Sequence, residues 1–244
     1  MTNASAIIKE LHKLADPKRA KVSARFFKTG PGQYGAGDKF LGIAVPALRK
    51  IAHKYNDLSF SDIIILLKNP VHEHRFVALE ILVAQYECGD ETTKKRIVDF
   101  YLRSTKYINN WDLVDTSAEY ILGDYLFDKP KKILYKLAKS KNLWERRMAI
   151  IATHHFIKRN QFTDTRAIAE ILLHDTHDLI HKAVGWMLRE VGKRSRAAEL
   201  RFLDAYGHRM PRTMLRYAVE KFSPQLRRHY LTKGLRVASL DKKH

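Results

Sequence analysis

The sequence predicts an all-α protein. From residue 45 onward apolar residues recur at helical spacing, connections are short, and no stretch reads convincingly as a strand. Similar helix starts also recur along the chain: Arg75, Trp111, Arg147, Lys182 and Arg216 lie 36, 36, 35 and 34 residues apart. A period of that length, made of two helices, is typical of an α-solenoid of HEAT-like or armadillo-type repeats. We expect a right-handed stack whose second helices line a basic concave groove.

The first 42 residues hold two expected helices and one loop. Residues 5–14 have an apolar side at helical spacing, and Asp16-Pro17 begins a second helix that runs to about residue 27. Residues 29–42 form a glycine-rich loop that matches the pattern G-x-G-x-x-G. A dinucleotide site is rejected there because no strand precedes the glycines, Pro31 lies among them and no helix starts at the third glycine. The glycines instead indicate turns with positive φ.

The rest of the chain is expected to be helical to about residue 231. The segments, in order, are residues 46–54, 59–67, 71–88, 91–102, 111–126, 131–139, 144–158, 165–173, 178–193, 196–206, 211–222 and 225–231. Pro70 and Pro130 separate neighbouring segments. Residues 1–232 are expected to form a single domain, and residues 233–244 a short basic tail.

Composition narrows the function. The 244 residues carry 45 Lys and Arg against 26 Asp and Glu, a net charge of +19, which favours a polyanionic partner such as nucleic acid. One cysteine excludes an internal disulfide framework. No signal peptide or membrane span is recognisable, so a cytoplasmic protein is expected, associated with the nucleoid if bacterial. We expect no metal and no cofactor, because the ligand types in His72-Glu73-His74 diverge around a helix.

Trp111 and Asp115 form the first candidate site. They are four residues apart and share one face of a helical turn, where an indole and a carboxylate together suit a cation. The competing interpretation is structural, since a Trp at helical spacing is usually part of the core. The recurrence of similar segments with Arg147 and Trp186 at the same period favours the functional interpretation.

Basic residues of two later segments form the second candidate site. Lys182, Trp186, Arg189 and Lys193 follow one helix face, and Arg212 and Arg216 are four residues apart. Cations at these spacings suit the phosphates of a duplex. Salt bridges inside the repeats are the alternative use of these side chains.

Several motifs resemble those of the AlkD-like DNA alkylation repair family, whose members are DNA glycosylases on a HEAT-like scaffold. The resemblance covers nearly the whole chain, and its carriers are residues 34–46, 72–75, 110–115, 144–150, 182–190 and 210–213. It implies that Trp111, Asp115, Arg147 and Trp186 are the catalytic residues. It also implies that Arg49 and Arg189 contact the DNA backbone. His155 stands where a basic phosphate contact is expected, and the pair His154-His155 is expected to face solvent or phosphate.

The expected activity is hydrolysis of the N-glycosidic bond of cationic N3- and N7-alkylated purines, such as 3-methyladenine and 7-methylguanine, in duplex DNA. Such a base leaves without protonation, so a single carboxylate, Asp115, is sufficient. The alternative functions are a non-catalytic binder of DNA structures and a scaffold for an acidic protein. A monomer is expected because repeats bury their core against one another.

Overall fold

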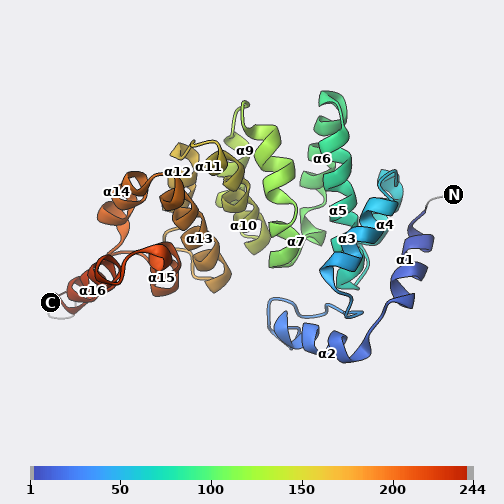
Figure 1. Ribbon diagram of the computed structural model, residues 1–244, viewed down its shortest axis with the longest axis horizontal. Coiled ribbons are helices and arrows are strands. Elements are labelled where there is room, and N and C mark those ends of the chain that lie inside the picture. The colour runs from blue at the N-terminus through green and yellow to red at the C-terminus, as the bar shows by residue number, and fades with distance from the viewer. Residues whose placement is uncertain (1–2, 241–244) are drawn as a thin grey trace. The chain divides into compact units, whose positions relative to one another are not determined.

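The computed structural model describes residues 3–240, with side chains up to residue 232. The chain divides into two compact units, residues 1–121 and 122–244. Within the described residues the secondary structure is helical apart from one isolated bridge between Lys39 and Val71 (Figure 1). The all-α prediction is therefore confirmed, and the succession of short packed helices is consistent with a solenoid of helical repeats. The right hand and the basic groove remain predictions.

The first unit is built around α5. Its helices are α1 (Ala4–Lys13), α2 (Pro17–Phe26), α3 (Val45–Lys54), α4 (Phe60–Leu67), α5 (His72–Cys88), α6 (Glu91–Arg103), η1 (Thr105–Tyr107) and α7 (Trp111–Asp115). Helices α3, α4, α6 and α7 contact α5, whose residues from His72 to Leu79 are all buried. Helix α2 differs from the others because none of its residues is buried. Side chains on α2 are thus available to a partner.

The loop before α3 is tied to α5 by a buried carboxylate. Glu73 accepts hydrogen bonds from the backbone N–H groups of Leu41, Gly42 and Ile43, at 3.0, 2.7 and 3.4 Å. Gly42 has a φ of +80°, and a Cβ there would collide with the backbone of α2. This loop is the expected glycine turn region, and Glu73 fixes it beside α7.

The second unit begins within a π-helix, η2 (Glu119–Gly123). Its helices are α8 (Asp124–Leu126), α9 (Lys132–Ala138), α10 (Leu143–Ala152), α11 (His154–Lys158), α12 (Thr163–Ile171), α13 (Asp178–Arg194), α14 (Arg196–Tyr206), α15 (Arg212–Ala218), η3 (Val219–Lys221) and α16 (Pro224–Leu240). Helix α13 packs against α10, α11, α12, α14 and α15, and eight of its residues, from Ile180 to Gly192, are buried. The backbone of α16 continues past the predicted helix end, while the side chains of the predicted tail lie outside the described residues.

Two segments expected to be single helices are interrupted. The first stops at Asp115, where Ser117 Oγ donates to the carbonyl of Leu113 at 2.6 Å. The second breaks at Thr153, whose Oγ1 donates to the carbonyl of Ile150 at 2.7 Å. Hydroxyl groups that bond nearby backbone carbonyls compete with the helical ladder and bend it. The break after Asp115 ends its helix immediately behind the candidate carboxylate.

No helix of residues 3–240 is both long enough and apolar enough to cross a membrane.

Candidate functional site

The turn α7 carries Trp111 and Asp115 and is held at its start by Asn110. Asn110 is fully buried, and its side-chain oxygen accepts from the Trp111 N–H at 2.8 Å. Its amide nitrogen donates to Asp38 Oδ2 at 3.2 Å, so the cap is itself anchored to the loop before α3. Leu113 and Val114 point into the core. Trp111 and Asp115, on the other side of the turn, are only half-buried.

A cluster of charged side chains lies beneath this turn. His72 places Nε2 at 2.7 Å from Asp112 Oδ2 and Nδ1 at 3.4 Å from Asp38 Oδ2. Arg75 pairs with Asp38 Oδ1 at 2.7 Å and donates to the carbonyl of Asn69 at 2.9 Å. Burial alone would raise the pKa of Asp38, but His72 and Arg75 outweigh it and lower that pKa. The carboxylate of Asp38 is therefore a stable acceptor for both cations.

Aromatic rings cover Trp111 on the same side. Phe27 stacks on the indole with ring centres 5.4 Å apart and planes 20° apart, and Phe26 meets it edge-on at 6.0 Å. Phe27 also stacks on Phe40 at 5.0 Å, and Phe40 stacks on His72 at 4.7 Å. The plane of the indole is thus set by neighbours from the end of α2 and from the loop. The sequence-based prediction named Trp111 and Asp115 but not these supporting side chains.

The turn behind Asp115 is also hydrogen-bonded. Ser117 uses its own proton on Leu113, so the fully buried Tyr101 donates its hydroxyl to Ser117 Oγ at 2.8 Å. Thr116 donates to Glu80, which also pairs with Arg49 at 3.3 Å. Arg49 is largely exposed, with 61% of its side chain accessible. The structure therefore links Arg49 to the residue that follows Asp115.

In the second unit, Arg147 is buried in the middle of α10. Asn142 caps this helix by accepting from the Trp144 N–H at 2.9 Å. Arg147 donates to the carbonyl of Leu179 at 2.6 Å, in the first turn of α13. A guanidinium carries five N–H donors in a rigid fork, so this bond sets the direction of the whole group. Arg147 joins α10 to the helix that carries Trp186.

Trp186 is half-buried on α13. Its indole N–H donates to Glu190 Oε1 at 3.1 Å, one turn further along the helix. The ring of His154 lies 5.8 Å from the indole. Gly185, beside Trp186, allows α15 to approach so closely that an added Cβ would collide with the Met214 carbonyl oxygen. The backbone of α13 is thereby fixed at the residue before Trp186.

A sequence profile described as DNA alkylation repair enzyme matches residues 7–222. The chain belongs to the DNA alkylation repair enzyme family. A solved structure described as "Predicted DNA alkylation repair enzyme from Enterococcus faecalis" has the same fold, with a TM-score of 0.67 at 13% sequence identity. The alignment covers 86% of this chain and 97% of that one. A search of curated protein sequences finds no match.

Membership in the DNA alkylation repair enzyme family supports an enzymatic role in the repair of alkylated DNA, with DNA as the substrate. The basic residues of α13 form ion pairs within the second unit. Lys182 pairs with Asp178 at 2.7 Å, Lys193 with Glu190 at 2.8 Å, and Arg189 with Glu190 and Glu220. Exposed ion pairs contribute little to stability, which applies to Lys182 and Lys193, whereas the side chain of Arg189 is only 17% exposed. These pairs show the alternative use of the basic side chains, while their role towards DNA stays a prediction.

The two predicted arginines of α15 differ in their contacts. Arg212 donates to the carbonyl of Leu231 at 2.5 Å, which ties α15 to α16. Arg216 is exposed, and none of the described side chains pairs with it. The guanidinium of Arg216 is therefore accessible, and its contact with DNA stays a prediction.

The expectation for His155 is wrong. The ring is buried against Phe127, at 5.7 Å between ring centres, and Nε2 lies 3.4 Å from Asp124 Oδ1. The side chain faces inward because the backbone at Gly123 approaches it closely: a Cβ added to Gly123 would collide with the Cβ of His155. His154, the other member of the pair, lies against Trp186 instead.

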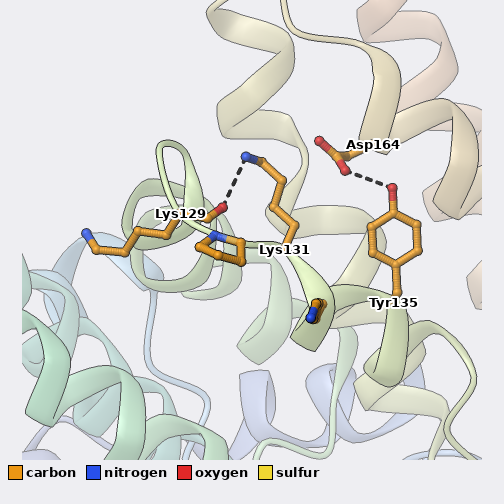
Figure 2. A pocket seen from close by; sticks show the side chains of 6 residues that line it. Lys129, Lys131, Tyr135 and Asp164 are labelled. Carbon is orange, nitrogen blue, oxygen red and sulfur yellow. Dashed lines mark hydrogen bonds between the residues drawn. The ribbon is translucent and has the colours of Figure 1, made fainter.

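One hollow of the second unit has none of these residues in its lining. It has a volume of about 470 Å³ and is lined by lysines before and on α9, by Tyr135 and by Asp164. Figure 2 shows that Lys131 turns back onto the chain, donating to the carbonyl of Lys129, and that Tyr135 donates to Asp164. Among the described residues, no three His, Cys, Asp or Glu side chains lie close enough to hold a metal ion.

Proposed function

We propose that the chain is a DNA glycosylase that hydrolyses the N-glycosidic bond of purines carrying an alkyl group on N3 or N7. The substrates are duplex DNA with 3-methyladenine or 7-methylguanine, and the reaction begins base excision repair. The observation that carries the proposal is the half-buried Asp115 carboxylate on one turn with Trp111. Family membership supports the substrate class.

The chemistry requires only one carboxylate. An alkylated N3 or N7 gives the purine a positive charge, so the electrons of the glycosidic bond neutralise the base as it leaves. The sugar becomes oxocarbenium-like, and the ionised Asp115 stabilises that charge. Asp115 also orients the attacking water and takes its proton as the new bond to C1′ forms.

The indoles and Arg147 have supporting roles. Trp111 and Trp186 present their π faces to the cationic nucleotide, each contact being worth on the order of 1 kcal/mol. Arg147, which is buried and donates to the carbonyl of Leu179, has the proposed role of binding a phosphate near the lesion. Arg49, Lys182, Arg189, Lys193, Arg212 and Arg216 bind the DNA backbone in a basic groove, and the protein acts as a monomer.

The experiment is the release of free base from N-methylated duplex DNA, measured by chromatography and mass spectrometry. We expect the unmodified protein to release 7-methylguanine and 3-methyladenine and to leave uracil and hypoxanthine in place. Asp115→Asn should lower the rate constant by roughly 100-fold or more, because the amide carries no charge to stabilise the sugar. DNA affinity should stay within a few-fold of the unmodified protein.

Asp99→Asn is the matched control, since Asp99 is an exposed carboxylate that pairs with Lys95. It should leave the release rate unchanged. DNA binding without any release of base would contradict the proposal and identify a non-catalytic binder. Absence of both binding and release would favour a scaffold for an acidic protein.

A further inference from the structure

A buried histidine holds the Trp111 turn from below. The side chain of His72 is only 4% exposed, and each of its ring nitrogens faces a carboxylate oxygen, of Asp112 at 2.7 Å and of Asp38 at 3.4 Å. A carboxylate accepts hydrogen bonds and donates none when ionised. A neutral imidazole has one N–H and would turn a lone pair towards one of the two acids. The imidazolium, with two N–H donors, is the form that satisfies both.

The His72 ring also contacts the aromatic side chains that pack around Trp111. Phe40 stacks on His72 with planes 23° apart, and Phe27 lies 4.9 Å from the His72 ring centre. Phe27 then stacks on the indole of Trp111. A cation on the face of a ring is attracted by its π electrons, and the attraction is stronger when the pair is shielded from water. His72 therefore contacts two neighbours of Trp111. One is Asp112, the next residue in the chain, and the other is Phe27, whose ring stacks on the indole.

We propose that His72, as an imidazolium, is a positioning residue that fixes the plane of the Trp111 indole and the place of the Asp115 carboxylate. It acts through Asp112 on α7, through Asp38 and the Asn110 cap, and through Phe27 and Phe40. The importance of this geometry for catalysis rests on the proposed function. The role of His72 in orienting the Trp111 indole is independent of that function.

A purely structural histidine differs from a positioning one in its response to pH. The charged groups that face His72 are Asp112 on α7, Asp38 in the loop and Arg75 on α5. Burial opposes the charge on the ring, but Asp112 and Asp38 outweigh burial and Arg75, and they raise the pKa of His72 to about 9. Above that pH the ring loses one N–H, and with it the hydrogen bond that holds one of the two acids, Asp112 on α7 or Asp38 in the loop.

The first experiment observes Trp111 directly. In a protein carrying Trp144→Phe and Trp186→Phe, Trp111 is the remaining tryptophan, and its emission maximum and acrylamide quenching are recorded from about pH 6 to about pH 10.5, a range that brackets the pKa of His72. We expect a change in both signals centred near pH 9. With His72→Gln added, that transition should be absent, and quenching near neutral pH should be higher than in the parent protein.

His74→Gln is the matched control. His74 lies on the same helix and is equally buried, but neither ring nitrogen has a hydrogen-bond partner among the described residues. Its variant should keep the transition near pH 9. Asp112→Asn, at a position with 17% of its side chain exposed, supplies a second test if His72→Gln does not fold, and it should shift the transition to lower pH.

The second experiment measures single-turnover release of 7-methylguanine, corrected for spontaneous loss, in the protein with its native tryptophans. His72→Gln should lower the rate constant by roughly 10- to 100-fold near neutral pH, because small displacements of reacting groups are costly, while DNA affinity changes less than about 3-fold. The rate of the unmodified protein should fall above pH 9, and that of the variant should not show this limb.

The two experiments fail in different ways. Identical Trp111 signals in the parent protein and in its His72→Gln variant across the pH range would overturn the inference, whatever the activity. No base release by the unmodified protein would overturn the proposed function and leave the fluorescence result to decide the role of His72.

Discussion

At the scale of single residues, the environment of Asp115 depends on hydrogen bonds that lie behind it. Tyr101 is fully buried, and burial raises the pKa of its hydroxyl well above the usual range, with the charge of Asp115 adding to the effect. Tyr101 therefore remains a neutral donor to Ser117, which in turn donates to Leu113. This chain of two hydrogen bonds joins α6 to the turn that ends in Asp115.

Removing the Tyr101 hydroxyl tests that link. Tyr101→Phe keeps the ring and leaves Ser117 with its bond to Leu113, so we expect a loss of about 1 kcal/mol in the free energy of unfolding. Urea denaturation measures it, with Tyr107→Phe as the control because Tyr107 is half-buried and its hydroxyl has no hydrogen bond among the described groups. A Tyr101→Phe protein as stable as the control would show that the bond contributes nothing.

At the scale of elements, α13 is positioned by close contacts with two neighbours. Gly185 lies so near α15 that an added Cβ would collide with the Met214 carbonyl oxygen and with the Cβ of Tyr217. On the other side, Glu199 of α14 packs against Gly192 and pairs with Arg196 at 2.9 Å. These contacts hold the helix that carries Trp186.

Gly185→Ala should separate α13 from α15. Because both clashing groups are backbone or Cβ atoms that cannot rotate away, we expect a loss of roughly 1–3 kcal/mol in unfolding free energy. Thermal or urea denaturation measures it. Gly30→Ala is the control, since its methyl group would meet only the flexible end of Gln33. Equal stability of the two variants would refute the close packing of α13 on α15.

Glu199 makes the contact between α13 and α14 depend on pH. Burial raises the pKa of Glu199 to about 8, although Arg196 opposes this. Between the ordinary pKa of 4.5 and 8 the folded protein holds a proton that the unfolded chain releases, so stability falls as pH rises through this window.

Glu199→Gln should remove that loss. At a pH just above 8 we expect the variant to gain roughly 1–3 kcal/mol over the unmodified protein in unfolding free energy, and the gain should shrink towards pH 4.5. Urea denaturation at several pH values gives the unfolding free energy of both proteins. Groups other than Glu199 titrate alike in the two, so their contribution cancels in the difference. The exposed Glu87, changed to Gln, is the control, and a pH-independent gain for Glu199→Gln would contradict the assigned pKa.

At the scale of the whole molecule, charge governs the encounter with DNA. The net charge of +19 attracts a polyanion, and each phosphate that is neutralised releases counterions. We expect the affinity for unmodified duplex to fall by roughly 100-fold or more between about 50 and 200 mM salt. Fluorescence anisotropy with labelled duplex measures the slope, and a flat dependence would contradict a binding surface made of cations.

The salt dependence of DNA affinity can also be used to test Arg216 alone. Arg216→Gln should reduce the slope of log affinity against log salt by about 1, as expected for one phosphate contact. Lys95→Gln removes the same charge from an exposed side chain that already pairs with Asp99. The Lys95 variant should keep the slope of the unmodified protein, and equal slopes for both variants would remove Arg216 from the DNA contacts.

The sequence predicted helices well where burial is periodic. Helix α14 has the expected bounds, and α5 and α13 differ from expectation by one residue at one end. The sequence did not predict the breaks near Ser117 and at Thr153. A hydroxyl that bonds a backbone carbonyl is compatible with either an unbroken or a bent helix, so the residue type alone does not reveal a break. His155 was misplaced because its burial depends on contacts with Gly123 and Phe127, which lie on a different segment of the chain.

What the sequence determined by itself is local or summed over the chain: helical type, the place of most helix ends, the repeat period, the net charge, and the presence of Trp111, Asp115, Arg147 and Trp186. The tertiary structure alone decided which groups contact them. The pairing of His72 with Asp112 spans 40 residues, and that of Arg147 with Leu179 spans 32. Helical periodicity records that a side chain is buried, whereas its partner is chosen by how separate helices pack, and that choice is not encoded in local spacing.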